Sequence, residues 1–243
     1  MLTDVAIIGG TGVGDALAKL AGEAIHIPTP DGQLAGRLMN HGSGPILLVS
    51  RHSVGHKLPP HRVNYRAIAR GLKEAGVRYC FSSAAVGSLR ADWPVGTFVA
   101  VSDFVDLTCR QSTMFDSAVV HTDFSAPFSP RGREALVKAG ADQGLVVQPT
   151  GVYVCENGPR YETPHEVDLI AHVGDVVGMT AATEAILMRE AGIEYACLAL
   201  VTNLAAGLSV GALSHQEVTQ EMEENSTPVL KLLLGATDLV RAL

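Results

Sequence analysis

The chain has 243 residues, of which 47% are hydrophobic and 18% are charged, and its formal net charge is −7. A chain of this length and hydrophobic content can bury the core of one large α/β domain and lies well outside the composition of disordered proteins. The acidic balance argues against a nucleic-acid-binding surface, which needs clustered Lys and Arg, but it permits a small anion held by backbone amides and one or two Arg or His residues.

The same composition bears on the compartment. The apolar run at residues 5–8 is too short for a secretory signal and leads directly into Gly9-Gly10, and no apolar stretch reaches membrane-spanning length. The four cysteines have neither C-x-x-C nor metal-site spacing. Apolar strand-like runs hold three of them, namely Cys80, Cys155 and Cys197. We therefore expect a soluble, cytoplasmic protein with buried free thiols and no membrane partner.

Short apolar runs alternate with longer amphipathic segments, which is typical of a mixed central β-sheet flanked by helices. Strands are predicted at residues 4–8, 45–50, 79–83, 98–105, 151–155, 175–177 and 195–201. Helices are predicted at residues 63–75, 130–143, 164–172, 181–191 and from about residue 215. Capping boxes support two of these helices, one at Thr163 and Glu166 and one at Ser214 and Glu217. No repeat or linker interrupts the pattern, so a single domain is predicted over residues 1–243.

Two early segments suit an anion. The glycine-rich turn at residues 9–14 can present backbone N–H groups, and Thr11 at its tip favours phosphate. The turn fails the last position of the dinucleotide pattern G-x-G-x-x-G/A, so a nicotinamide oxidoreductase is the weakest alternative. Arg51 and His52 follow a predicted strand, where α/β proteins bind ligands, and a guanidinium matches an oxyanion. A surface or ion-paired arginine is the alternative at that position.

Two further segments have less specific patterns. The small residues at 82–88 end a predicted strand and permit either close backbone approach to a ligand or a tight strand–helix crossover. Residues 108–130 have little periodicity and include His121. A long irregular segment inside a compact domain is usually a functional lid or a contact to a partner subunit.

Three motifs then lie within fifty residues: Gly-Pro-Arg-Tyr-Glu-Thr at 158–163, Gly-Met-Thr at 178–180 and Thr-Asn-Leu-Ala-Ala-Gly at 202–207. They combine hydrogen-bonding side chains with apolar and aromatic ones, the mixture that a heteroaromatic base needs. The Glu162 carboxylate can accept a hydrogen bond from a purine N1–H, and the Asn203 amide can bridge O6 and N7. The sequence therefore predicts a site for a nucleoside and a phosphate.

The order of these motifs, together with residues 63–67 (Val-Asn-Tyr-Arg-Ala) and 87–90 (Gly-Ser-Leu-Arg), resembles the trimeric purine nucleoside phosphorylases and 5′-methylthioadenosine phosphorylases. The resemblance extends from about Val5 to the C-terminal helix. It implies a mixed central sheet surrounded by helices, a metal-free active site with inorganic phosphate as co-substrate and no cofactor, and a homotrimer.

The resemblance also implies a role for each site residue. It implies phosphate binding by Thr11, Arg51, His52, the backbone around Ala85, and Thr180. It implies nucleoside binding by Tyr161, Glu162, Met179, Asn203, His215 and, from the neighbouring subunit, His121. The catalytic roles fall to Asn203, Glu162 and His52, and the loop near the sugar contains His56 and His61.

Two positions indicate the substrate. In relatives that act on 6-aminopurines this motif resembles Thr-Asp-x-Asp, and here Asn203 and Ala205 occupy its two acidic positions. The pattern is therefore similar to that of the 6-oxopurine enzymes, which act on inosine or guanosine. His215 matches a histidine that hydrogen-bonds a 5′-hydroxyl, where methylthio-specific relatives tend to be apolar. Phosphorolysis of methylthioinosine or methylthioadenosine is the nearest alternative.

Other positions depart from the family pattern. Ala84 stands where many relatives have Thr or Asn, residues 53–55 are irregular, and Thr183 replaces a usual proline. The loss of a polar contact at Ala84 keeps open a silent nucleoside-binding protein, and a hydrolase that uses water is a further alternative.

Overall fold

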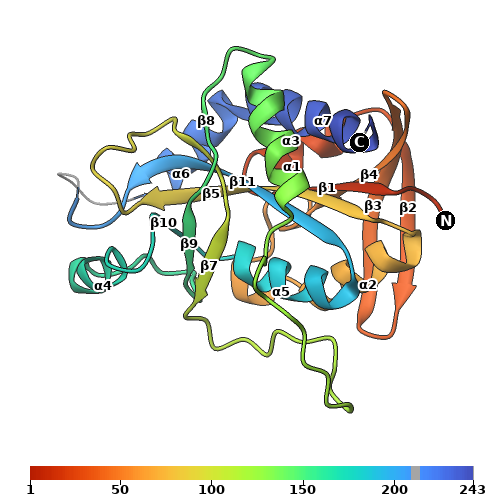
Figure 1. The fold of residues 1–243 in the computed structure, drawn as a ribbon, viewed down its shortest axis with the longest axis horizontal. Coiled ribbons are helices and arrows are strands. Elements are labelled where there is room, and N and C mark those ends of the chain that lie inside the picture. The colour runs from red at the N-terminus through yellow and green to blue at the C-terminus, as the bar shows by residue number, and fades with distance from the viewer. Residues whose placement is uncertain (209–213, 243) are drawn as a thin grey trace.

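A computed structural model describes residues 1–208 and 214–242. It shows an α/β fold in which helices cover both faces of a mixed sheet (Figure 1), as the alternation of apolar and amphipathic segments predicts. Of the helices described, none is both long enough and apolar enough to cross a membrane.

The sheet joins eleven strands. They are β1 (Val5–Gly9), β2 (Glu23–Thr29), β3 (Gly32–His41), β4 (Gly44–Ser50), β5 (Tyr79–Ser88), β6 (Phe98–Ala100), β7 (Asp103–Asp106), β8 (Val147–Gln148), β9 (Val152–Cys155), β10 (Val176–Gly178) and β11 (Glu194–Leu204). The main path runs β2-β3-β4-β1-β5-β10-β9-β7, and β11 pairs with β5 and β6 away from that path. Parallel pairs join β1 to β4 and β5, and β5 to β11, so the carboxyl ends of these four strands lie on one side.

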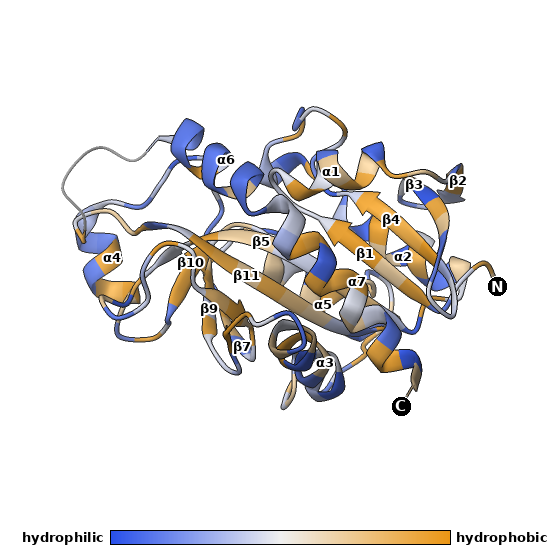
Figure 2. Ribbon diagram, turned by 90° about the horizontal axis from the view of Figure 1, so that it is seen from above, coloured by the Kyte–Doolittle hydropathy of each residue, from blue (hydrophilic) through white to orange (hydrophobic). Residues whose placement is uncertain are grey.

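The helices pack in two layers. They are α1 (Val13–Lys19), α2 (Tyr65–Ala75), α3 (Pro130–Ala141), α4 (Pro164–Ile170), α5 (Ala181–Ala191), α6 (His215–Glu224) and α7 (Ser226–Ala242), with a short 3-10 helix at Pro60–Arg62. One buried cluster joins the sheet to α2 and α5, and a second joins it to α1, α3 and α7. Figure 2 shows hydrophobic residues concentrated in the central strands, as burial on both faces of the sheet requires.

Local signals set the helix boundaries. The capping box at α4 is complete, because Thr163 accepts from the Glu166 amide and the Glu166 carboxylate accepts from the Thr163 amide. Ser214 accepts from the Glu217 amide at the start of α6. Asn64 caps α2, so that helix begins two residues later than predicted.

Several predicted boundaries were wrong. The strand predicted at 98–105 is two strands, because the chain leaves β11 and turns to β9 at Val101 and Ser102. The strand predicted to end at residue 83 continues to Ser88, since its far end pairs with β11 and β10. The C-terminal helical region is two helices, which meet at Asn225.

The segment between β7 and α3, residues 107–129, forms no helix or strand. We call it the arm. Its first part packs against α5, where the Thr113 hydroxyl donates to Glu190 at 3.0 Å, and its tip projects beyond the helices (Figure 1). The side chains of Val119 and Val120 are exposed. Its irregular backbone agrees with the absence of periodicity in its sequence.

Candidate active site

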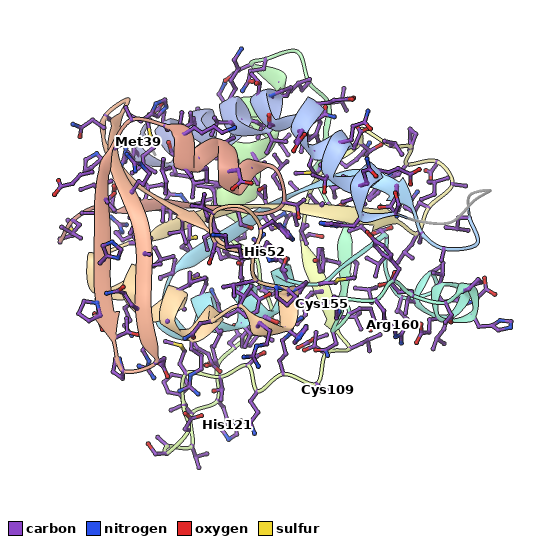
Figure 3. The ribbon with its side chains drawn as sticks, turned by 180° about the vertical axis from the view of Figure 1, so that it is seen from behind. Met39, His52, Cys109, His121, Cys155 and Arg160 are labelled. Atoms are coloured by element: carbon purple, nitrogen blue, oxygen red, sulfur yellow. The ribbon has the colours of Figure 1, made fainter. Side chains whose placement is uncertain are left out.

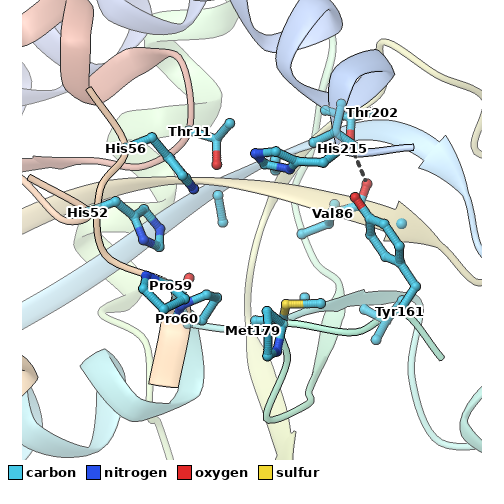
Figure 4. A pocket seen from close by; sticks show the side chains of 18 of the residues that line it. Thr11, His52, His56, Pro59, Pro60, Val86, Tyr161, Met179, Thr202 and His215 are labelled. Atoms are coloured by element: carbon cyan, nitrogen blue, oxygen red, sulfur yellow. Dashed lines mark hydrogen bonds between the residues drawn. The ribbon is translucent and has the colours of Figure 1, made fainter. Parts of the chain in front are cut away.

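A cavity of about 350 Å³ opens at the carboxyl ends of the central strands. Some of its lining residues come from the turn after β1, the loop after β4 and the second half of β5. Others come from the loop before α4, the start of α5, the end of β11 and the start of α6. The lining residues include Thr11, Arg51, His52, Ala85, Tyr161, Glu162, Met179, Thr180, Asn203 and His215. Thus all the predicted site residues except His61 and His121 line one cavity, which we call the active-site cavity (Figure 4).

One edge of β5 is open in this cavity. Up to Ser82 that edge pairs with β1, and from Gly87 it pairs with β10. Because alternate residues of a strand direct their backbone groups to the same edge, the N–H and C=O of Ala85 face the gap. Within the described residues no ladder bond uses them. The gap can therefore offer a backbone N–H to an anion.

Two threonine hydroxyls lie near the open edge. Thr11 is at the turn after β1, where the Gly10 amide donates to the Ser83 hydroxyl at 3.1 Å. Thr180 precedes α5, and its side chain makes no capping bond to that helix. Both hydroxyls line the active-site cavity and can donate to a phosphate oxygen.

Arg51 lies behind these groups and is buried, with only 2% of its surface exposed. Its guanidinium makes a bidentate ion pair with Glu184, with Nε–Oε1 at 2.5 Å and Nη2–Oε2 at 2.7 Å, and Nη1 donates to the Ser83 carbonyl at 2.8 Å. Gly10 permits this position, since a Cβ there would lie 2.5 Å from Nη1. Burial opposes the charge of Arg51, but the adjacent Glu184 carboxylate raises the pKa of the guanidinium well above its ordinary value.

The carboxylate of Glu184 is held in turn by Tyr195. The Tyr195 hydroxyl donates to Oε2 at 2.6 Å and lies 2.6 Å from the Ser82 hydroxyl. Burial raises the pKa of Tyr195, so this donor keeps its proton. Arg51 is therefore ion-paired, as one of the two sequence interpretations allowed, but at the wall of a ligand cavity. Two of its five N–H groups, one on Nη1 and one on Nη2, are not used by these three bonds.

His52 is a neutral base in this site. Its Nδ1 lies 2.8 Å from the Leu58 carbonyl, which can only accept, so Nδ1 carries the proton and Nε2 is an acceptor. Burial, followed by the charge of Arg51, lowers the pKa of His52 to about 3. His52 can thus accept a hydrogen bond from a sugar hydroxyl or from a protonated phosphate, but it adds no positive charge at neutral pH.

This low pKa predicts acid sensitivity. The unfolded chain binds a proton at His52 near pH 6.5, and the folded chain only near pH 3. The free energy of unfolding is therefore unaffected by His52 above pH 6.5 and decreases as the pH drops below that value. At pH 4.5 the loss should be about 3 kcal/mol. Urea unfolding at pH 7 and pH 4.5 measures it, and His52→Gln should lose correspondingly less stability on acidification. Equal losses in the two proteins would contradict the assignment.

Two more histidine rings, those of His56 and His215, lie near His52 in the cavity. The His52 and His56 rings stack with centroids 4.3 Å apart, and the His56 and His215 rings are 5.2 Å apart (Figure 4). Burial, followed by the charge on His215, lowers the pKa of His56. Among the described residues, no group of three or more His, Cys, Asp or Glu is placed to hold a metal ion.

The opposite end of the active-site cavity can recognise a base. Glu162 is buried, and burial raises the pKa of its carboxyl group above the usual value. Within the described residues this carboxylate accepts from the Glu162 backbone N–H, and no side chain donates to it. A purine N1–H would supply the donor that an ionised buried carboxylate needs.

A β-bulge directs Asn203. The register of β11 against β5 shifts between Val201 and Asn203, and such shifts re-aim side chains near ligand sites. The Thr202 hydroxyl lies 3.0 Å from Asn203 Oδ1, and Nδ2 donates to the Leu204 carbonyl at 3.0 Å. These bonds fix the amide plane and leave one N–H and one lone pair for a ligand.

Apolar side chains complete the base site. Tyr161 and Met179 stand on the side of the cavity away from His52 and His56 (Figure 4). They supply an aromatic face and a thioether, next to the hydrogen-bonding groups of Glu162 and Asn203. The arrangement fits a flat heterocycle that is read along one edge.

Two histidines with predicted roles lie elsewhere. His61 is exposed and does not line the active-site cavity. His121 is exposed in the arm, distant from His52 (Figure 3). Three residues of the site were not predicted: Glu184 pairs with Arg51, Tyr195 holds Glu184, and Lys57 lines the cavity. The Arg51–Glu184 pair spans 133 residues, so no local pattern could have revealed it.

The chain is similar to known proteins over most of its length. The model of the phosphorylase superfamily matches residues 4–237. The chain is 41% identical to a probable 6-oxopurine nucleoside phosphorylase of Dictyoglomus turgidum, over 94% of this chain and 88% of that protein. It is 39% identical to a probable S-methyl-5′-thioinosine phosphorylase of Methanopyrus kandleri, over 96% and 91% of the two chains. A structure of methylthioadenosine phosphorylase from Schistosoma mansoni in complex with adenine matches with a TM-score of 0.92 and 31% identity, covering 98% of this chain and 92% of that one.

Proposed function

The chain belongs to the phosphorylase superfamily, and we propose that it is a purine nucleoside phosphorylase that cleaves 6-oxopurine nucleosides such as inosine and guanosine. The observation that carries this proposal is that two groups line the same cavity: the buried Glu162 carboxylate, to which no described side chain donates, and the bulge-directed Asn203 amide. A 6-oxopurine offers N1–H to the first and O6 and N7 to the second.

The reaction is a pentosyl transfer to inorganic phosphate, the co-substrate, with no other cofactor. A phosphate oxygen forms a bond to C1′ while the bond to N9 breaks, and the electron pair of that bond moves into the purine. Asn203 at O6 and N7 and Glu162 at N1–H bind more strongly as charge develops on the base, which lowers the barrier. The products are a free purine, protonated by solvent, and a pentose 1-phosphate, as in purine salvage.

The phosphate subsite lies at the open edge of β5. Thr11, Thr180 and the Ala85 N–H can donate to its oxygens, and the remaining N–H groups of Arg51 supply charge. The phosphate, on the face of the sugar opposite the base, stabilises the cationic, oxocarbenium-like C1′ and is held in position for attack. His52 Nε2 accepts a hydrogen bond from a hydroxyl of the sugar or of a protonated phosphate.

Assembly into a homotrimer is part of the proposal. The arm exposes Val119 and Val120 beside His121, which suits contact with a second copy of the chain whose active-site cavity His121 would reach. The buried free thiols of Cys80, Cys155 and Cys197 fit a reducing cytoplasm.

Base release from five nucleosides, each with and without phosphate, tests the proposal: inosine, guanosine, adenosine, methylthioinosine and methylthioadenosine. Phosphate-dependent cleavage of inosine and guanosine is expected. Phosphorolysis of methylthioinosine is the second candidate, because a probable S-methyl-5′-thioinosine phosphorylase is 39% identical in sequence to this chain. Preference for it would overturn the role of His215 at the 5′ position, and adenosine cleavage would overturn the base assignment. Cleavage without phosphate would indicate a hydrolase.

A further inference from the structure

Arg110, in the arm, reaches the wall behind the active-site cavity without lining it. Its Nη1 donates to the Met179 carbonyl at 2.8 Å and to the Thr183 hydroxyl at 3.1 Å. Its Nη2 donates to the Asn157 carbonyl at 2.7 Å. One guanidinium therefore joins the start of α5 to the loop that precedes α4.

These two attachment points belong to the two walls that would enclose a nucleoside. Met179 is one wall, and Asn157 begins the loop that leads to Tyr161 and Glu162. The walls already touch at Gly158, where a Cβ would lie 2.3 Å from the Met179 sulfur. The hydrogen bonds from the Arg110 guanidinium to the Met179 and Asn157 carbonyls therefore fix the distance between Met179 and the loop.

Arg110 also faces a third wall. Its guanidinium carbon lies 5.4 Å from the centre of the Tyr65 ring, and the Tyr65 hydroxyl donates to the Pro60 carbonyl at 3.0 Å. Pro60 lines the active-site cavity. The planar, always charged guanidinium of arginine can donate hydrogen bonds in two directions and stack on a ring at the same time, which lysine cannot do.

We propose that Arg110 is a positioning residue that sets the spacing between Met179 and the Tyr161–Glu162 loop, and thereby the affinity for the purine nucleoside but not for phosphate. The inference rests on the proposed function for the identity of the ligand. It gives Thr183 a role, because a hydroxyl accepts a bond from Arg110 that the family's usual proline side chain could not. Of the residues proposed to bind phosphate, Arg51 and Thr11 make no contact with Arg110 among the described residues. Thr180 follows Met179, but its own amide is held separately by the Tyr153 hydroxyl at 3.1 Å.

Binding of inosine, of hypoxanthine and of phosphate to Arg110→Lys and Arg110→Met, measured by calorimetry, tests this. Loss of charge-assisted bonds should weaken inosine and hypoxanthine binding roughly tenfold. Phosphate binding should change less than about twofold, and the KM values should divide in the same way. Thr183→Val, a milder change, should weaken inosine binding by roughly two- to threefold and keeps the test possible if the Arg110 variants do not fold.

Arg189→Met is the matched control. Arg189 Nε donates to the Asp123 carbonyl of the arm at 3.1 Å but contacts no wall of the active-site cavity, so both affinities should stay unchanged. Unchanged inosine binding in the Arg110 and Thr183 variants, or equal weakening of inosine and phosphate, would overturn the inference. Failure of the wild-type protein to cleave any nucleoside would instead contradict the proposed function, since the binding measurement needs no turnover.

Discussion

Replacing Asn203 by alanine should lower the turnover of inosine and guanosine by about a hundredfold or more. The amide is held by Thr202 and by the Leu204 carbonyl, so it is oriented before the substrate arrives. Loss of a preorganised donor to charge that develops in the transition state costs about 3 kcal/mol or more, which corresponds to that factor. Steady-state kinetics with saturating phosphate measures it, and the KM for phosphate should stay close to the wild-type value.

Two further variants define the role of Asn203. Thr202→Val removes the bond to Oδ1 and should cause a smaller loss, roughly tenfold, because the amide remains but is less fixed. Asn203→Asp should admit adenosine, since a carboxylic acid can donate a proton towards N7 of a 6-aminopurine. Wild-type turnover by Asn203→Ala would exclude a base-edge role, and loss of all activity in Asn203→Asp would show that base discrimination lies elsewhere.

Replacing Glu184 by alanine should destabilise the protein by about 3–5 kcal/mol, because it leaves the buried Arg51 guanidinium without its counter-charge. Both side chains are about 1% exposed, so water cannot take over the bonds. The free energy of unfolding from urea titration at pH 7 measures the loss. The KM for phosphate should also rise, since Glu184 and the Tyr195 hydroxyl hold Arg51 in place.

The double variant Arg51→Met/Glu184→Leu separates stability from function. Apolar side chains of similar volume can replace a buried ion pair at little cost, so much of the lost stability should return while phosphate binding remains weak. Recovery of phosphate affinity in the double variant would show that Arg51 does not contact phosphate. A stability of Glu184→Ala equal to that of the wild type would contradict the importance of the pair.

The sequence predicts the central strands well because burial on both faces makes them continuous apolar runs. The run from Val5 to Ile8 was located this way, whereas the helix at Ala181–Ala191 was located as a longer amphipathic segment. The β2–β3 hairpin was missed, since most of its residues are at least partly exposed and Pro28 and Gly32 read as loop. In β2, Ile25 and Ile27 do alternate with exposed residues, but this alternation is too short to mark a strand by itself.

The candidate site was predictable where each motif follows a strand, as for Arg51 after β4 and Thr180 after β10. It was not predictable where function depends on contacts between distant segments. Glu184 and Tyr195 lie within ordinary helix and strand patterns, and only the fold brings them to Arg51 and Ser82. The bulge that aims Asn203 likewise depends on the pairing of β11 with β5.

The most direct test is phosphorus NMR of the protein incubated with inosine and inorganic phosphate. Ribose 1-phosphate should form in a one-to-one ratio with hypoxanthine, and the reaction should stop when phosphate is removed, because in the proposed mechanism phosphate at the open edge of β5 is the nucleophile. Formation of hypoxanthine with free ribose and no sugar phosphate would contradict phosphorolysis.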